Sequence, residues 1–321
     1  MLRPALAVSG RIPAAEAWFE SEDEFYLGPE YGVAAPTDGR FQIRNQERHP
    51  STRLFPYNTI CFLEVDTGSG FQPACTGTLI APRVVLTARH CLLNLVDPAS
   101  YASCGSMTIS DPAFARIRVT PGADFSAAPA RQRPARPTSI IATARNILVD
   151  TNLDYGIIIL PRAFTSPSQF MLLQPRSDAN TQTLLTIAGY PCDKPNGTMW
   201  GHSDRIPLGG VTATHLHYTI DTCAGHSGSP IWLLGNGGVR ILLGVHTGLR
   251  PGFGAACNND PILGCAGTGA AVTPVAGLQN CGVRVTCSMI DNIRAWCRRA
   301  RVRLPNVDAR AYQMNCGRPL R

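Results

Sequence analysis

The stretch Asp221-Thr-Cys-Ala-Gly-His-Ser-Gly-Ser-Pro230 decides how the rest of this 321-residue chain is understood. It places Ser227 in a loop of small residues, between Gly225 and Gly228. Small residues allow the backbone N–H groups of Gly225 and Ser227 to point into one cavity, as an oxyanion hole requires. Glycine–serine loops are also common turns, so this loop alone does not identify a nucleophile.

Two upstream segments supply candidate partners for the serine. Residues 75–91 place His90 after an apolar strand, and residues 152–160 place Asp154 at the start of another. A serine hydroxyl is a weak nucleophile until a base takes its proton, and a histidine with a pKa of about 6.5 suits that task. Asp154 would fix the tautomer of His90, which gives a triad in the order His, Asp, Ser known from chymotrypsin.

Asp150 opens the same loop as Asp154 and is the alternative acid. We prefer Asp154 because it directly precedes the apolar strand. A chain that keeps all three residues but only binds its partner is the alternative of a different class.

Short apolar runs separated by Gly, Pro, Asn and Asp predict an all-β fold, because they recur without helices between them. The expected strands include 55–65, 76–80, 84–87, 140–141, 157–160, 184–188, 215–220, 231–234 and 239–245. Residues 98–137, which hold one or two short strands, and residues 251–280 are expected to be surface insertions. Apolar residues at helical spacing predict one helix over about 287–303, which Pro305 would stop.

Composition narrows the class of protein. Twelve cysteines without a paired Cys-x-x-Cys pattern predict disulfides and an oxidising compartment. The net charge of +7 rests on scattered arginines, since Lys194 is the only lysine, and scattered charge predicts no nucleic-acid partner. No stretch approaches the roughly 18 apolar residues of a membrane span. The acidic residues 1–38 are interpreted as a leader.

Several motifs together resemble the glutamyl endopeptidases of the V8-like branch of the chymotrypsin-fold serine proteases. The resemblance covers roughly residues 38–97, 138–249 and 281–296. The motifs that carry it are Asp38-Gly-Arg40, Phe55-Pro-Tyr-Asn58, Cys75-Thr-Gly-Thr-Leu-Ile-Ala-Pro82, Leu86-Thr-Ala-Arg-His-Cys91, Gly189-Tyr-Pro-Cys-Asp-Lys-Pro-Asn-Gly-Thr-Met-Trp200, Tyr218-Thr-Ile-Asp-Thr222, Leu243-Gly-Val-His-Thr-Gly248 and Gly282-Val-Arg-Val-Thr286. The chain departs from the family at His226, where Asn or Gln is usual, and in its cysteine count and its two insertions.

The resemblance implies two six-stranded antiparallel β-barrels with the active site in the cleft between them. It predicts a first barrel over residues 39–165 with His90 and Asp154, and a second over 166–321 with Ser227 and the C-terminal helix. It also implies a disulfide between Cys75 and Cys91. Residues 1–38 would then be a prosegment of a secreted, monomeric serine endopeptidase that acts on proteins or peptides and needs no cofactor.

The resemblance also implies where a substrate side chain binds. Thr222 and His246 would line a pocket for a glutamate before the scissile bond, with the released N-terminal amine as a third partner. Asp221 stands six residues before Ser227, where trypsin-like proteases keep the acid that binds Arg or Lys, and it supports the alternative specificity. We favour glutamate, with slower cleavage after aspartate, because no glutamate occurs after Glu64, so the body of the chain is protected from such an enzyme.

Other histidines and cysteines are given lesser roles. His215 and His217 share one face of a strand without an evident third ligand, so they are interpreted as structural and no metal is predicted. Cys223 is a candidate partner of Cys257 or Cys265, and Cys297 of Cys316, although twelve cysteines allow many connectivities.

Overall fold

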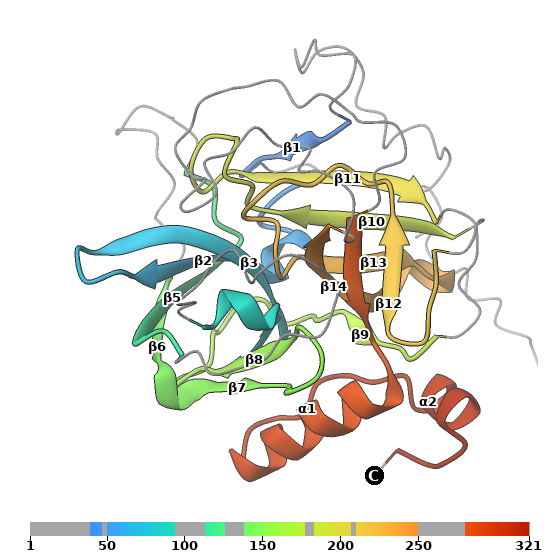
Figure 1. The fold of residues 1–321 in the computed structure, drawn as a ribbon. Helices are drawn as coiled ribbons and strands as arrows, with labels where there is room; N and C mark the ends of the chain where they lie inside the picture. The colour runs from blue at the N-terminus through green and yellow to red at the C-terminus, as the bar shows by residue number, and fades with distance from the viewer. Residues whose placement is uncertain are drawn as a thin grey trace, which may run out of the picture. The chain divides into compact units, whose positions relative to one another are not determined.

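The computed structural model describes residues 39–46, 50–93, 113–125, 138–176, 183–206, 210–249 and 280–320. The predicted leader and most of the predicted 251–280 insertion lie outside these ranges. Runs of β-branched and apolar residues form two curled sheets (Figure 1). The first sheet has neighbour order β6-β5-β2-β3-β4-β8-β7 and is antiparallel throughout. Its strands are β2 (Ile60–Asp66), β3 (Phe71–Ala81), β4 (Val84–Thr87), β5 (Arg116–Pro121), β6 (Ile140–Thr143), β7 (Ile147–Val149) and β8 (Gly156–Ile159).

The second sheet has neighbour order β1-β11-β10-β13-β14-β15-β12, with β9 pairing to β14 off this path. Its pairs are antiparallel except for β9 with β14. The strands are β1 (Phe41–Ile43), β9 (Leu172–Leu173), β10 (Leu184–Gly189), β11 (Met199–Arg205), β12 (His215–Tyr218), β13 (Pro230–Leu234), β14 (Arg240–Leu249) and β15 (Asn280–Arg284).

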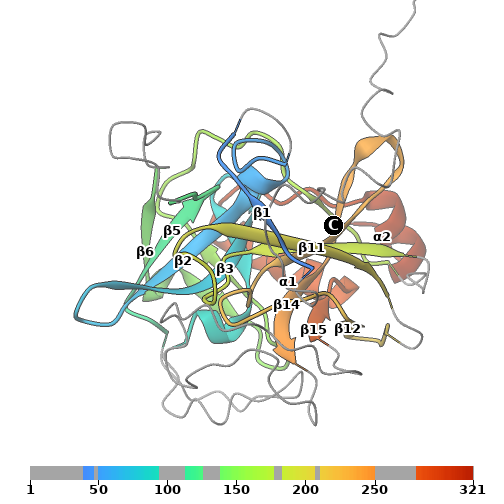
Figure 2. The same ribbon diagram turned by 90° about the horizontal axis from the view of Figure 1, so that it is seen from above.

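The predicted fold class, all-β with two antiparallel barrels, is confirmed, but the strand count differs from six in each. The described residues form seven strands in the first sheet and eight in the second. One extra strand is β1, which falls in the range predicted for the first barrel but pairs with β11 (Figure 2). Another is β9, which is too short to give a sequence signal. The predicted insertion 98–137 contains β5, whose Ile117 and Val119 are fully buried between β2 and β6.

The C-terminal helix α1 spans Cys287–Arg299 and ends earlier than predicted. Thr286 caps its first turn, because its hydroxyl accepts a hydrogen bond from the Met289 N–H. Arg301 adopts a left-handed backbone conformation with φ of 54°, which ends the helix before Pro305 is reached. A second helix, α2 (Ala309–Cys316), was not predicted. No helix in the described part of the chain is long and apolar enough to cross a membrane.

Two disulfides between described cysteines tie these elements together. Cys75 bonds to Cys91 as predicted, and Cys287 bonds to Cys316, which joins α1 to α2. The suggested pairing of Cys297 with Cys316 is therefore wrong, and Cys297 is a buried free thiol on the core side of α1. Cys223 is also disulfide-bonded. Its suggested partners lie outside the described residues.

Candidate active site

Asp154 and His90 form a two-point contact across the first sheet. The Nδ1 atom of His90 lies 2.8 Å from Oδ2 of Asp154, and the backbone N–H of His90 donates to Oδ1 at 3.0 Å. His90 follows β4 in a short 3₁₀ turn, while Asp154 precedes β8, which pairs with β4. The pairing of two buried, apolar strands thus brings these two residues together.

Asp154 is ionised despite its burial at 7% exposure. Burial alone would raise the pKa of its carboxyl, but the charge of His90, two hydrogen bonds from His90 and the charge of Arg89 together hold the pKa below its usual value. A carboxylate so placed accepts the Nδ1–H of the imidazole, which makes Nε2 the basic nitrogen of the ring.

Asp150, the alternative acid, binds its own loop instead. Its Oδ1 accepts hydrogen bonds from the backbone N–H groups of Asn152 and Leu153, both at 2.8 Å. Its Oδ2 accepts from the Tyr155 hydroxyl at 2.9 Å. The structure therefore pairs Asp154, not Asp150, with His90.

Ser227 is held against the segment that carries His90. The N–H of Thr76 donates to the Ser227 carbonyl at 2.8 Å, and Sγ of Cys91 lies 3.5 Å from the same oxygen. The Cys75–Cys91 disulfide therefore closes the loop at the point where it contacts Ser227. Gly228, with φ of +85°, completes the fit, because a Cβ there would lie 2.0 Å from the Thr76 carbonyl oxygen.

The backbone around Ser227 presents N–H groups that can donate to an acceptor. Gly225 has φ of +91°, and within the described part of the chain no acceptor contacts its N–H or that of Ser227. His226, which sequence reasoning did not assign, orders this turn: its Nδ1 accepts from the Cys223 N–H at 3.0 Å, and its side chain is buried. Two N–H groups without an acceptor in one turn can donate together to a negatively charged oxygen.

His246 lies on β14 and its backbone joins the serine loop. Its carbonyl accepts from the Gly228 N–H at 2.7 Å, and its N–H donates to the Ser229 carbonyl at 2.9 Å. Its imidazole is 2% exposed, and its Nδ1 lies 2.7 Å from the hydroxyl of Tyr218, also buried. Sequence reasoning missed this tyrosine. Thr222, the other predicted pocket residue, is largely buried as well.

Burial keeps the His246 imidazole neutral. Desolvation, followed by the charge of nearby His90, lowers its pKa to about 3, although the backbone carbonyl of Cys281 and the Asp154 carboxylate act in the opposite direction. His90 and Asp154 both act electrostatically on His246, which therefore lies close to the candidate triad. At neutral pH this imidazole offers a neutral N–H or a lone pair, not a positive charge.

Asp221 faces the start of the described chain. Its Oδ2 accepts from the Gly39 N–H at 2.8 Å and lies 3.4 Å from Nδ1 of His202, which accepts from the Asp221 N–H at 2.9 Å. Gly39 fits closely here, because a Cβ would lie 2.7 Å from the His202 ring. The carboxylate thus already accepts a hydrogen bond from the backbone of Gly39.

Metal ligands are not gathered at this site. Within the described ranges, the one group of three possible ligands is Cys75, His90 and Cys91, and its two sulfur atoms are bonded to each other. Disulfide sulfurs are not the thiolates that bind zinc. His215 and His217 stack with ring centroids 6.4 Å apart.

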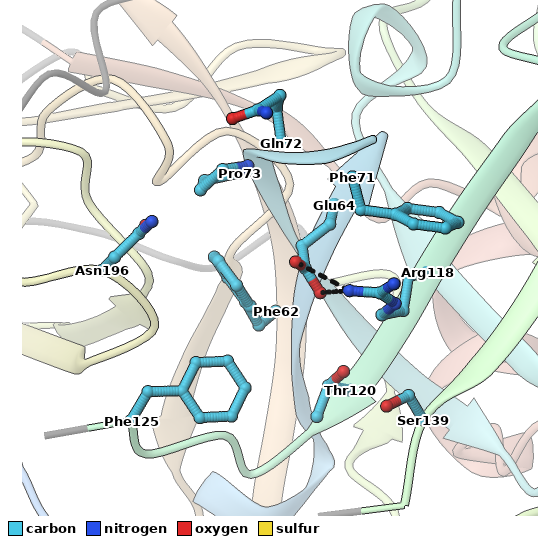
Figure 3. A pocket seen from close by; sticks show the side chains of 10 residues that line it. All are labelled: Phe62, Glu64, Phe71, Gln72, Pro73, Arg118, Thr120, Phe125, Ser139 and Asn196. Carbon is cyan, nitrogen blue, oxygen red and sulfur yellow. Dashed lines mark hydrogen bonds and ion pairs between the residues drawn. The ribbon is translucent and has the colours of Figure 1, made fainter. Parts of the chain in front are cut away.

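A separate pocket of about 500 Å³ opens on the first sheet and contains none of the predicted site residues (Figure 3). Its wall includes Phe62, Phe71 and Phe125, and Glu64 and Arg118 are joined by an ion pair at 3.2 Å. The Arg118 guanidinium also lies 3.9 Å from the Phe71 ring centroid. The charges in this pocket are therefore already paired within the protein.

Several known proteins resemble this chain in sequence or in fold. A family model described as Trypsin matches residues 51–265. The chain is 29% identical over 195 residues to a glutamyl endopeptidase of Bacillus licheniformis, which covers 59% of this chain and 52% of that protein. It is 24% identical over 217 residues to a glutamyl endopeptidase of Staphylococcus epidermidis, which covers 67% of this chain and 66% of that protein.

Two further matches are a second kind of protease and a solved structure. An extracellular metalloprotease of Bacillus subtilis is 28% identical over 229 residues, covering 66% of this chain and 64% of that protein. The chain thus matches about half to two thirds of the length of these relatives. A solved structure of a Glu endopeptidase in complex with MPD superimposes with a TM-score of 0.54 at 24% identity, covering 82% of this chain and 99% of the other. This likeness supports the two-sheet fold.

Proposed function

Because the chain belongs to the trypsin family, we propose that it is a serine endopeptidase in which Ser227, His90 and Asp154 form the catalytic triad. The observation that carries the proposal is the two-point contact of the Asp154 carboxylate with the side chain and backbone of His90. This contact fixes the tautomer in which Nε2 is the basic nitrogen, and the Thr76 hydrogen bond holds Ser227 beside the same segment.

The reaction then proceeds in two halves. Ser227 Oγ attacks the peptide carbonyl while His90 Nε2 takes the hydroxyl proton, and Asp154 stabilises the imidazolium. The N–H groups of Gly225 and Ser227 stabilise the negative oxygen of the tetrahedral intermediate. The imidazolium returns its proton to the leaving amine, which leaves an acyl-enzyme. Water repeats the sequence with His90 as base and releases the acid and free Ser227.

For specificity we propose cleavage after glutamate, and more slowly after aspartate, with Thr222 and His246 at the pocket. Two relatives named glutamyl endopeptidase and the absence of glutamate after Glu64 support this assignment. The hydrogen bond that Asp221 accepts from Gly39 speaks against the trypsin-like alternative, since that carboxylate is already occupied. A neutral His246 N–H can still donate to a substrate carboxylate.

The chain's setting is also a proposal. We propose a secreted enzyme that acts as a monomer on protein or peptide substrates, with a prosegment within residues 1–38 that is removed on activation. One relative is named an extracellular metalloprotease, and the many disulfide-bonded cysteines suit an oxidising compartment. Cleavage near Glu30 would free an amine for the pocket, and N-terminal sequencing of active protein should find a start near residue 31. Full activity in a chain that still begins at Met1 would contradict this.

Labelling with a fluorophosphonate separates an enzyme from a silent binding protein. We expect one label per chain at Ser227 and none in Ser227→Ala, which should fold normally but lose nearly all turnover. Absence of labelling in the intact chain would reject the enzyme. A peptide set varied only at the residue before the scissile bond then tests specificity. A preference for Arg or Lys over Glu would reject the assignment of Thr222 and His246.

A further inference from the structure

One side chain of α1 reaches the loop that carries Asp154. Asn292 donates through Nδ2 to Oδ2 of Asp150 at 2.9 Å and to the Tyr155 hydroxyl at 3.0 Å. Figure 1 shows α1 next to the β7–β8 edge of the first sheet, and one turn further along the helix the Trp296 ring lies 6.0 Å from that of Tyr155. The C-terminal helix is therefore bonded to the segment between β7 and β8.

Asp150 is the centre of this loop. Its carboxylate accepts four hydrogen bonds, from the N–H groups of Asn152 and Leu153, from the Tyr155 hydroxyl and from Asn292. The residues on both sides of Asp154 are thus held by Asp150. Asp154 itself is left to face His90.

The other side of the loop is hydrogen-bonded to Arg89, the residue before His90. Arg89 is fully buried, and its Nη1 donates to the Asp150 carbonyl at 2.9 Å. Asp150 therefore links Asn292 of α1 to Arg89, while Asp154 contacts His90. A shift of Asp150 would move both contacts with the segment 89–90.

We propose that Asn292 is a positioning residue for hydrolysis: α1 holds Asp150 and thereby fixes Asp154 against His90. This inference rests on the proposed function. Its physical basis is that catalysis depends on placement, because a misplacement of 1 Å from a change far from the chemistry can cost about 10²-fold in rate. Asn292 does not contact the triad, so it acts only through Asp150 and Tyr155.

The test is a reciprocal exchange of side chains. Asn292→Ala removes both hydrogen bonds and should lower kcat about 10-fold with KM within about twofold. Asn292→Asp places two carboxylates in contact and should lower kcat further. Asp150→Asn leaves two amide groups facing each other and should also be impaired. In the double variant Asp150→Asn/Asn292→Asp, the amide at position 150 and the Tyr155 hydroxyl can both donate to the carboxylate at position 292. The value of kcat should therefore return to within about threefold of the original.

Two measurements distinguish positioning from general destabilisation. The rate of fluorophosphonate labelling, normalised to the sites finally labelled, counts only folded protein. The downfield ¹H NMR resonance of the proton between His90 and Asp154 should shift or broaden in both Asn292 variants and return in the double variant. Arg299→Gln, at an exposed position on the same helix, is the matched control and should change neither.

The outcomes are separable. Equal kcat and an unchanged resonance in Asn292→Ala, or a double variant no better than the worse single one, would overturn the inference. If the intact chain hydrolyses nothing, the proposed function fails, while the His90–Asp154 resonance still decides whether Asn292 positions the pair.

Discussion

The buried neutral His246 should make the protein sensitive to mild acid, and His246→Gln should remove part of that sensitivity. Burial lowers the His246 pKa from 6.5 to about 3. Below pH 6.5 the unfolded chain therefore binds a proton at this residue while the folded chain does not, so the stabilisation is present above pH 6.5 and is lost as the pH falls toward 3. The slope is about 1.4 kcal/mol per pH unit. Between pH 6.5 and 4.5, His246 should therefore cost about 2–3 kcal/mol of the free energy of unfolding.

Urea unfolding followed by tryptophan fluorescence measures this quantity at pH 8, 6.5, 5.5 and 4.5. The Ser227→Ala background prevents self-cleavage during the measurement. His246→Gln should shift stability by a constant amount at high pH and show a shallower decline in acid. Tyr218→Phe removes the hydroxyl that lies 2.7 Å from Nδ1 but keeps the titrating imidazole, so it should retain the steep decline.

His215 contributes in the same direction, because burial also lowers its pKa, but the comparison cancels its effect since both proteins contain it. Parallel stability curves for the parent and His246→Gln would refute the argument. An NMR titration that found His246 protonating near pH 6.5 would refute it directly.

Three other substitutions follow from the site. Asp154→Asn should lower kcat by about 10³–10⁴-fold while the fold is kept, because the amide cannot hold the imidazole as the carboxylate does. Steady-state kinetics measure kcat and circular dichroism checks the fold; a loss of kcat below tenfold would contradict the prediction. Replacing Cys75 and Cys91 together by Ala opens a loop of sequence separation 16 and should lower the free energy of unfolding by about 3 kcal/mol. Urea titrations measure this free energy, and no change would mean that packing alone holds the loop. Asp221→Asn should leave the preference for glutamate within about threefold in a peptide panel, since its carboxylate faces Gly39; a collapse of Arg or Lys cleavage would instead restore the trypsin-like alternative.

The sequence predicted those features that depend on residues close together in the chain. The strands around His90 and Asp154 are continuous apolar runs, and β4 and β8 are buried as such runs predict. The disulfide between Cys75 and Cys91 closes a short loop beside one motif, and the family resemblance was enough to pair them. The Ser227 loop is identified by its glycines, which permit backbone angles that other residues avoid.

The sequence favoured Asp154 over Asp150 only by its position before an apolar strand, and it did not indicate the residues that support the site. Tyr218 meets His246 across 28 residues of chain, and Asn292 meets Asp150 across 142. Tyr218 begins one of the family motifs, but that motif does not indicate its contact with His246, and Asn292 belongs to none of the motifs. Strand β1 likewise joins β11 of the second sheet, although it precedes every strand of the first.

What the sequence indicated by itself was the all-β class and the candidates for the triad, because period, glycine placement and motif order are properties of neighbouring residues. The family resemblance implied the disulfide between Cys75 and Cys91. Only the tertiary structure decided that Asp154 contacts His90, that Asp221 is bound by Gly39 and that the His246 imidazole is neutral. The physical reason is that hydrogen-bond partners and desolvation depend on which distant segments pack together. A pKa or a contact between residues far apart in the chain exists only once the sheets have formed.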